Sequence, residues 1–390
     1  MVRLGDIATV ITKGTTPTSI GFTFKNEGIN FVKIESVDEN GKFIFEKFDH
    51  ISDECHEKLK RSQLQENDIL FSIAGAIGKT AIVTKEILPA NTNQALAIIR
   101  IPQGIINYSF LLYILQSSVV LEQAEKKKQG VAQLNLSLKD IGDFIIPDVP
   151  LAEQQEIVDN LNKVSNLISL RKQQLSKLDE LVKSRFIEMF GDPVSNPLGW
   201  KNQTLKEVCL KLNDGTHFSP ESFEIGEYKY VTAKNIKLSG FDFTNITYVP
   251  EEVHRPIYDR CNPELGDVLY IKDGVTTGIA MVNTLEEEFT LLSSVALLKQ
   301  DRQIMNGSFL AALLNNENMY ADIRSNMGGA AITRLTIAKL NAIKVIVPPI
   351  ELQNQFAAFA EQTDKSKSEI QKSLEKLETL KKALMQKYFG

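Results

Sequence analysis

Apolar residues recur at alternating steps of three and four along two long stretches of the chain. The first stretch begins at Ile157 and the second at Phe356, and charged or amide side chains fill most positions between. A mean spacing of 3.5 residues is typical of a coiled-coil seam. The predicted seam positions are Ile157, Leu161, Val164, Ile168, Leu175, Leu178, Val182 and Met189, and then Phe356, Ala360, Ile370, Leu374, Leu377, Leu384 and Tyr388.

Two helices of this kind need a partner. A helix of roughly 35–40 residues is roughly 50–60 Å long, and a lone helix exposing such a stripe is a poor monomer. Each stripe could instead pack on its own globular domain. Neither stretch contains Pro or Gly, which favours a continuous coil between the two helices. We therefore expect an antiparallel intramolecular coiled coil.

The regions before the two helices have a different pattern. Short β-type runs such as "ILFSI" and "ALAIIR" are mixed with a helix-like segment, "YSFLLYILQSSVVLEQAEKKK". Prolines at 147, 150, 348 and 349 close these regions. The pattern predicts an α+β chain with mixed α/β domains at residues 1–150 and 200–349. Each domain is followed by a spacer helix, at residues 151–192 and 350–390.

The two domains are copies of one another. With a shift of 199 residues, "FVKIESV" meets "YVTAKNI", "QALAIIR" meets "SSVALLK", and "SFLLYIL" meets "SFLAALL". The start of each helix also matches, as "PLAEQQEI" and "PIELQNQF", and the Phe-Gly ends agree. A period of this length indicates a duplicated domain-and-helix pair rather than a solenoid repeat.

One motif raises the question of nucleotide binding. The stretch "FSIAGAIGKTAIV" ends a glycine turn in Gly78-Lys79-Thr80, but a phosphate-binding loop needs glycine where Ile73 stands. In the second copy, "DGVTTGIA", Ile279 follows Gly278, so the lysine is absent. The sequence predicts a structural turn that does not bind ATP.

Composition narrows the class of protein. Among 390 residues, 43% are hydrophobic and 24% charged, the balance of a folded chain with two globular units. The amino-terminal stretch lacks the apolar core of a secretion signal, and no run is long enough to span a membrane. Three cysteines fit a reducing cytoplasm, and the four scattered histidines lack metal-ligand spacing, so no metal is expected.

Two similar modules held by two paired helices form a ruler. Antiparallel pairing would relate the modules by a pseudo-two-fold axis at a fixed separation. That arrangement suits an extended, roughly two-fold ligand, and duplex DNA read at two half-sites is the leading candidate.

Several stretches resemble one known family. "ITKGTTP", "NDILFSIAGAIGKTAIV" and "QGVAQLNLSLKDIGDFIIPDVPLAEQQEIV", followed by the helix, resemble the specificity subunit of type I restriction–modification enzymes, in the right order and twice over. The second copy departs from the pattern, with "LNDGTHF" for "ITKGTTP" and without the glutamate of "PLAEQQEIV". The resemblance implies two target-recognition domains, each reading half of a split, asymmetric DNA sequence. It also implies spacer helices that dock two methyltransferase subunits, which motor-nuclease subunits join.

On this interpretation the chain is not catalytic. We find no glycine-rich methyl-donor loop, no nuclease Asp…Glu-x-Lys cluster and no nucleophile elbow. S-adenosylmethionine, ATP and Mg²⁺ are expected on partner subunits, and none of them on this chain. Two alternatives stay open: a coiled-coil scaffold that never touches DNA, and an enzyme with an unrecognised site.

Charge does not mark a DNA-binding face. The net charge is −5; residues 1–150 carry 16 Lys and Arg against 18 Asp and Glu, and residues 200–349 carry 15 against 18. Either the cations cluster on one face, or partner subunits supply much of the DNA affinity. "EKKKQG" at 125–130 is more typical of a solvated helix end than of a phosphate clamp.

Polar loop residues that match between the copies are the predicted DNA contacts, although any one of them could be an ordinary solvated residue. They are Lys13, Thr15, Thr16, Lys33, Ser36, Lys79 and Gln94 in the first copy, and Thr216, His217, Thr232, Lys234, Thr276, Thr277 and Ser293 in the second.

Overall fold

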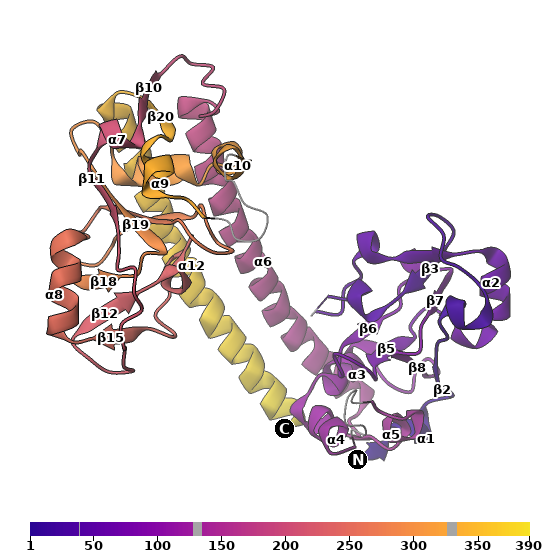
Figure 1. The fold of residues 1–390 in the computed structure, drawn as a ribbon. Helices are drawn as coiled ribbons and strands as arrows, with labels where there is room; N and C mark the ends of the chain where they lie inside the picture. The colour runs from indigo at the N-terminus through magenta and orange to yellow at the C-terminus, as the bar shows by residue number, and fades with distance from the viewer. Residues whose placement is uncertain (39, 128–134, 326–333) are drawn as a thin grey trace. The chain divides into compact units, whose positions relative to one another are not determined.

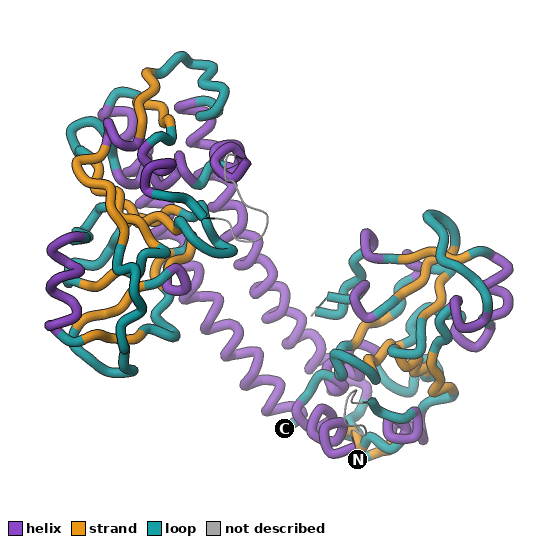
Figure 2. The backbone as a smooth tube through the Cα atoms, viewed as in Figure 1, coloured by secondary structure: helices purple, strands orange, loops and turns teal. Residues whose placement is uncertain are grey.

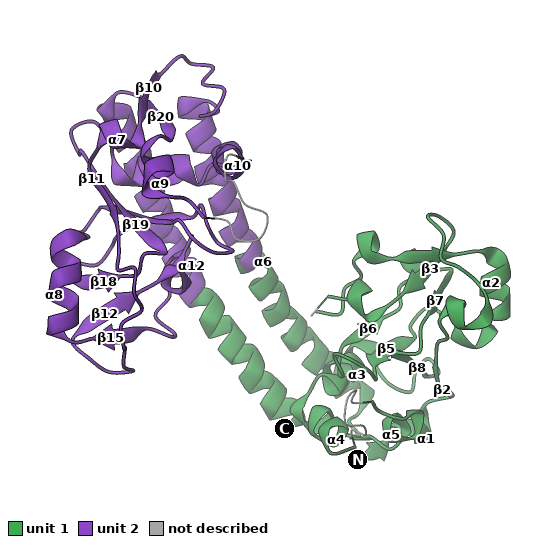
Figure 3. Cartoon of the chain, in the orientation of Figure 1, with its two compact units in different colours: residues 1–171, 373–390 green, residues 172–372 purple. Residues whose placement is uncertain are grey.

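The computed structural model describes residues 1–38, 40–127, 135–325 and 334–390. The chain divides into two compact units (Figure 3). Unit 1 comprises residues 1–171 and 373–390, and unit 2 comprises residues 172–372. Each unit therefore holds a globular part and one portion of each long helix.

Unit 1 is built around a four-stranded antiparallel sheet of order β2-β8-β5-β6, beside a three-stranded sheet of order β4-β3-β7 (Figure 1). In the smaller sheet β3 is parallel to β7. The strands of unit 1 are β1 Val2–Arg3, β2 Val10–Lys13, β3 Ile29–Val32, β4 Asp49–Ile51, β5 Ile69–Ser72, β6 Thr80–Ile82, β7 Ala90–Thr92, β8 Leu96–Arg100 and β9 Ile145–Ile146. Its short helices are α1 Leu4–Ile7, α2 Asp53–Lys58, α3 Tyr108–Leu115, α4 Ser118–Lys127 and α5 Leu138–Gly142, with 3-10 turns at Pro17–Ile20, Ile34–Ser36, Phe45–Lys47, Lys60–Ser62 and Lys85–Ile87.

Unit 2 repeats this plan. Its sheets have the orders β11-β19-β16-β17 and β15-β12-β18, and β12 is parallel to β18. Its strands are β10 Lys201–Thr204, β11 Cys209–Asp214, β12 Tyr228–Val231, β13 Ile236–Lys237, β14 Gly240–Phe241, β15 Thr247–Val249, β16 Val268–Ile271, β17 Ala280–Val282, β18 Phe289–Leu291, β19 Val295–Gln300 and β20 Lys344–Val347. Its helices are α7 Leu205–Val208, α8 Glu251–Arg260, α9 Gly307–Leu314, α10 Glu317–Ser325 and α11 Ile337–Asn341, with a 3-10 turn at Ala233–Asn235. The duplication seen in the sequence is thus a duplication of fold.

Local sequence explains where these elements begin. Strand β5 is buried along its whole length, as expected for the continuous apolar run "ILF" at the centre of a sheet. Helices α3 and α9 both begin after an asparagine, Asn107 or Asn306, whose side chain accepts hydrogen bonds from two backbone amides of the first turn. The helices pack against the main sheet, α3 on β5 and β6, and α9 on β16 and β17.

The two long helices are α6, Leu151–Phe190, and α12, Ile350–Phe389, each of 40 residues. Figure 2 shows both as unbroken helices, in contrast to the short strands and loops of the globular parts. They run antiparallel, because the start of α6 meets the end of α12 in unit 1, whereas the end of α6 meets the start of α12 in unit 2. In unit 1, Asn160 Nδ2 lies 3.3 Å from the Tyr388 hydroxyl. In unit 2, Lys367 Nζ lies 2.7 Å from Asp179 Oδ1.

The predicted seam positions all lie on the covered side of the helices. Five of the fifteen positions are buried (Ile157, Leu161, Val164, Phe356 and Leu374), and the other ten are half-buried (Ile168, Leu175, Leu178, Val182, Met189, Ala360, Ile370, Leu377, Leu384 and Tyr388). The ends of the stripes also join the globular cores: Ile157 and Leu161 belong to the core of unit 1, and Phe356 to that of unit 2. The apolar stripes therefore pack in both of the ways considered: against the other long helix and, at their ends, against the globular domains.

A buried glutamine attaches the start of each long helix to its domain. Gln154 Oε1 accepts a hydrogen bond from the Asn107 amide at 2.8 Å, and its Nε2 donates to the Val149 carbonyl at 2.7 Å. Gln353 repeats this arrangement with the Asn306 amide and the Pro348 carbonyl. The glutamine shared by "PLAEQQEI" and "PIELQNQF" thus has a structural reason, since a buried amide needs such partners. Within the described ranges, no helix is long and apolar enough to cross a membrane.

Candidate nucleic-acid interface

Each unit brings two polar loops together at the edge where its two sheets meet. In unit 1, residues 14–16 lie against residues 93–95, and we call them loop pair 1. The Gly14 amide donates to the Asn93 carbonyl at 3.1 Å, and the Thr15 amide to the Thr92 carbonyl at 3.2 Å. In unit 2, residues 215–217 lie against residues 292–294, and we call them loop pair 2. The two loops of each pair are distant in the sequence, and the fold places them side by side.

Loop pair 2 shares one of these backbone hydrogen bonds and adds another. The Thr216 amide donates to the Leu291 carbonyl at 2.8 Å, and the Ser293 amide to the Thr216 carbonyl at 2.8 Å. Glycine is required at the crossing: a Cβ on Gly14 would lie 1.8 Å from the Thr92 carbonyl oxygen, and one on Gly215 would lie 1.9 Å from that of Leu291. The shared glycine of "KGTT" and "DGTH" therefore permits close backbone approach.

Several predicted contact residues do meet in these loops. In loop pair 1, Thr16 donates a hydrogen bond to the Gln94 side-chain oxygen, and Gln94 is exposed. Lys13 is half-buried at the end of β2, as are Thr15 and Thr16. In loop pair 2, His217 is exposed and Ser293 is half-buried.

Three of the predicted contact residues have buried side chains. The Ser36 hydroxyl is buried, accepts from the Lys33 amide at 3.2 Å and donates to the Lys47 carbonyl at 2.9 Å. Thr216 is buried with its hydroxyl bonded within its own turn, and buried Thr277 donates to the Gly274 carbonyl at 2.6 Å. Their side chains stabilise turns and are not available to a ligand in this conformation.

Three of the remaining predicted residues, Lys33, Lys79 and Thr232, have structural partners, although they are less covered. Lys33 pairs with Asp49, and its ammonium lies 4.8 Å from the Phe24 ring centre. The Lys79 ammonium donates to the Val37 carbonyl at 2.5 Å. Thr232 is half-buried and caps a 3-10 turn, whereas Lys234 and Thr276 are exposed. Thr232 lies beside loop pair 2, since the Leu292 amide donates to the Val231 carbonyl at 3.0 Å and the Ala233 amide to the Ser294 hydroxyl at 3.3 Å.

The glycine turns at 78 and 278 are structural in both units. Gly78 and Gly278 have positive φ, of +94° and +111°. A Cβ would lie 2.5 Å from the Leu121 side chain in unit 1 and 2.4 Å from the Tyr320 ring in unit 2. Each turn therefore packs against a short helix of its own unit, α4 or α10, which explains why both copies keep glycine there.

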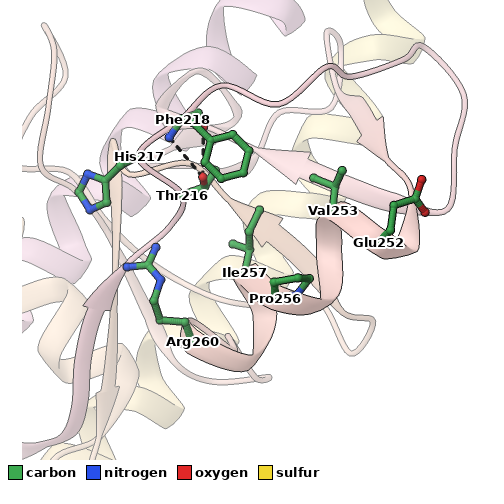
Figure 4. A pocket seen from close by; sticks show the side chains of 8 residues that line it. All are labelled: Thr216, His217, Phe218, Glu252, Val253, Pro256, Ile257 and Arg260. Atoms are coloured by element: carbon green, nitrogen blue, oxygen red, sulfur yellow. Dashed lines mark hydrogen bonds between the residues drawn. The ribbon is translucent and has the colours of Figure 1, made fainter.

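Charged residues that the pattern did not single out surround loop pair 2. Asp214 at the end of β11 contacts Lys272 Nζ at 3.3 Å, His217 Nε2 at 3.2 Å and Arg260 Nη1 at 3.7 Å. Figure 4 shows His217 and Arg260 on the same side of a cavity of about 420 Å³ between this loop and α8. The sequence does mark this position as different between the copies, because Asp214 stands in the second copy where the first has Lys13. Its partners, however, come from distant strands and helices.

The side chains around Asp214 and loop pair 2 do not form a metal site or a reactive thiol site. No group of three or more metal-ligating side chains was found in the ranges that the structure describes. Burial raises the pKa of the Cys261 thiol to about 12, so it stays protonated at neutral pH. The arrangement presents cations, hydroxyls and an exposed aromatic ring, Phe218, which are groups suited to contacting a nucleic acid.

Comparison with known proteins places this arrangement in a family. A model of the "Type I restriction modification DNA specificity domain" matches residues 1–180 and again residues 197–382. The chain belongs to this family. Both matches include a globular domain and much of the long helix that follows it, so the family's unit corresponds to one copy of the duplication.

Curated relatives agree with this family membership. The chain is 31% identical over 170 residues to the EcoBI specificity subunit of Escherichia coli, a match covering 42% of this chain and 35% of that relative. It is 24% identical to the putative type I restriction enzyme MjaX specificity subunit of Methanocaldococcus jannaschii, across 98% of this chain and 91% of that relative. The long match includes both copies.

Solved structures of specificity subunits share the fold. The S subunit of a type I restriction–modification system from M. genitalium superposes with a TM-score of 0.59 at 16% identity, covering 100% of this chain and 95% of that one. A chain from a study of complex assembly and conformational transition of the type I system gives a TM-score of 0.60 at 20% identity, covering 99% and 96%. At these identities the likeness concerns the fold.

The crossing glycines give a first testable prediction for this family member. Gly14→Ala should lower the free energy of unfolding by roughly 1–3 kcal/mol, because the new methyl group meets the Thr92 backbone and the loop must move. Gly142→Ala is the matched control in the same unit, since its Cβ would make only an ordinary contact of 3.6 Å with Ile11. Chemical denaturation followed by circular dichroism compares them. Equal stability of the two variants would show that loop pair 1 accommodates a side chain.

Proposed function

We propose that this chain is the DNA specificity subunit of a type I restriction–modification enzyme, and that each unit reads one half of a bipartite target. The observation that carries the proposal is the duplicated fold, in which each copy presents a loop pair joined by an equivalent backbone hydrogen bond, from the Thr15 amide to the Thr92 carbonyl or from the Thr216 amide to the Leu291 carbonyl. Two copies of one reading domain are what a two-part DNA sequence requires. The family membership and the specificity-subunit relatives support the same assignment.

The two half-sites should differ in sequence. Loop pair 1 carries Lys13, Thr16 and Gln94, whereas the equivalent positions of loop pair 2 are Asp214, His217 and Ser293. Loops that differ in this way give the two units different reading surfaces, and base edges in the major groove are distinguished by their patterns of donors and acceptors. A pair of copies with different loops therefore fits an asymmetric target.

In this proposal the long helices set the distance between the half-sites and dock two methyltransferase subunits, which restriction subunits join. Relatives named as specificity subunits of restriction enzymes support such partners. The chain itself is non-catalytic: S-adenosylmethionine would bind to the methyltransferase, and ATP and Mg²⁺ to the motor-nuclease subunits. Its own contribution is recognition of sequence.

Methylation sequencing of cells with and without the gene tests the proposal. We expect one bipartite, asymmetric motif to be methylated in the parent and unmethylated in the deletion strain, and to return when the gene is restored. A restored gene lacking residues 200–349 is the control, and it should not restore that motif. An unchanged methylome after deletion would favour the alternative, a protein scaffold that does not read DNA.

A further inference from the structure

Loop pair 2 stands on a network of six charged or titratable side chains, which we call the Asp214 network: Asp214, His217, Arg260, Lys272, Asp273 and Arg334. Lys272 is its centre. The Lys272 ammonium lies 3.3 Å from Asp214 Oδ2 and 3.1 Å from Asp273 Oδ2, and it links the two carboxylates. Arg334 Nε lies 3.3 Å from the other oxygen of Asp273.

The network has a surplus of positive charge, and the surplus faces solvent. Three permanent cations stand against two carboxylates, and His217 adds a further positive charge when it is protonated. The side chains of Arg260, His217 and Arg334 are 43%, 57% and 58% exposed, whereas those of Asp214 and Lys272 are 4% and 2% exposed. The two carboxylates pair with the cations, and the exposed side chains of the network are those of Arg260, His217 and Arg334, whereas Glu252, outside the network, is exposed and lines the same cavity.

The position of Arg260 is fixed on two sides. Its guanidinium donates to the Gly215 carbonyl in loop pair 2, and its own carbonyl accepts from Asn213 Nδ2 at 3.0 Å. Beside it, the cavity of Figure 4 has apolar walls that include Phe218, Pro256 and Ile257. Low-dielectric walls strengthen the field of a neighbouring cation and thereby its attraction for an anion.

In unit 1 a different residue supplies positive charge at the crossing loop. The residue that matches Asp214 is Lys13, and the one that matches Lys272 is Ile73, which is buried among apolar neighbours. In the part of the chain that the structure describes, Lys13 forms no ion pair, and it lies half-buried beside Gly14. In the second copy an aspartate stands in place of this loop lysine and contacts Lys272, Arg260 and His217. Each unit therefore has positive charge beside its crossing loop, from Lys13 in unit 1 and from the Asp214 network in unit 2.

From this we infer that the Asp214 network is a DNA phosphate site, in which Arg260, His217 and Arg334 contact the backbone of the duplex next to loop pair 2. This inference rests on the proposed function and assigns a role within it. Phosphate contacts position a reading domain without selecting bases, and arginine is well suited to phosphate oxygens. Base selection then belongs to other exposed groups of unit 2.

The test measures DNA affinity as a function of salt for the chain assembled with its methyltransferase subunits. Two duplexes of equal length are used, one with the methylated motif and one with that motif scrambled. Arg260→Gln should weaken binding to both duplexes by the same factor. It should also make the slope of log affinity against log salt concentration shallower by about 0.9 for each phosphate group that the variant no longer neutralises. Arg334→Gln should act in the same direction.

Two control variants separate phosphate binding from structural effects. Arg260→Lys keeps the charge and should keep most of the salt slope. Arg255→Gln changes another arginine of α8 with 42% side-chain exposure, but one already paired with Glu251 and Glu288, so the slope should not change. The fluorescence of Trp200, whose indole donates to the Phe190 carbonyl in the unit 2 core, reports whether each variant is folded.

Each other outcome overturns the inference in a distinct way. A relaxed preference at one base pair with an unchanged salt slope would identify Arg260 as a base contact. Unchanged binding by both folded variants, Arg260→Gln and Arg334→Gln, would show that DNA does not meet this surface. If the unaltered complex bound neither duplex, the proposed function itself would fail, which is a different result from a failure of the variants alone.

Discussion

Replacing residues 1–150 with the corresponding domain of a relative should change one half of the methylated motif and leave the other half unchanged. The physical reason is that the two reading domains have separate hydrophobic cores, since each buried cluster of the described residues belongs wholly to unit 1 or wholly to unit 2. A good side-chain contact to a base contributes roughly 1–3 kcal/mol of discrimination at its own base pair. Exchanging a whole loop pair therefore moves specificity by several orders of magnitude at one half-site.

The donor domain must keep the contacts that residues 1–150 make with the two long helices. The core of unit 1 includes the end of α12, where Phe389 packs on Phe110 with ring centres 5.4 Å apart, and Gln154 binds the start of α3. The donor domain should therefore keep an aromatic residue at position 110 and an asparagine at position 107. Methylation sequencing reads the outcome. A reciprocal replacement of residues 200–349 is the matched control and should alter only the other half.

Two outcomes would contradict the prediction that the two copies read their half-sites independently. If both halves of the motif change together, or if neither changes in an active and folded chimaera, the two copies do not read separate half-sites. A chimaera that fails to fold is recognised beforehand by circular dichroism. Lys33→Ala with Thr16→Ala in unit 1 is a smaller alteration of the same domain and should affect the same half of the motif.

Long-period features of this protein could be predicted from its sequence because they repeat. The 3.5-residue spacing extends along each of two helices, so the stripe is evident even where single positions such as Ile168 are only half-buried. The duplication identified the glycine turn as structural, and the contacts of Gly78 and Gly278 with α4 and α10 supply the reason. A shared glutamine likewise proved to fasten each helix to its domain.

The chemistry of the interface was harder to predict, because it depends on contacts between residues distant in the chain. Asp214 and Lys272 pair across 58 positions, and nothing in the local sequence around "IKDG" shows that its lysine is buried. Matching polar residues between copies also favoured hydroxyls that stabilise turns, such as Ser36 and Thr277, since turns repeat as faithfully as binding residues do. Arg260 was missed because it ends a helix rather than lying in a loop.

The last prediction concerns the helices as a ruler. Inserting 21 residues of heptad repeat into both helices, after Arg171 in α6 and after Lys372 in α12, should lengthen the gap between half-sites by about nine base pairs. Three heptads add roughly 32 Å at 1.5 Å per residue, which is close to one turn of B-DNA at 34–36 Å. The seam stays in phase because the insertion is a whole number of heptads.

Both helices must be lengthened, because each unit contains a portion of both. Inserting the same segment into α6 alone would put Val182 and Phe186 out of register with α12 in unit 2, and we expect that variant to lose methylation. A matched insertion of seven residues is a further control. It adds roughly 10 Å, about a third of a DNA turn, so the second half-site would face a different side of the duplex and methylation should fall. Methylation sequencing measures the gap directly. An active 21-residue variant with the original gap would show that the paired helices do not determine the spacing of the target.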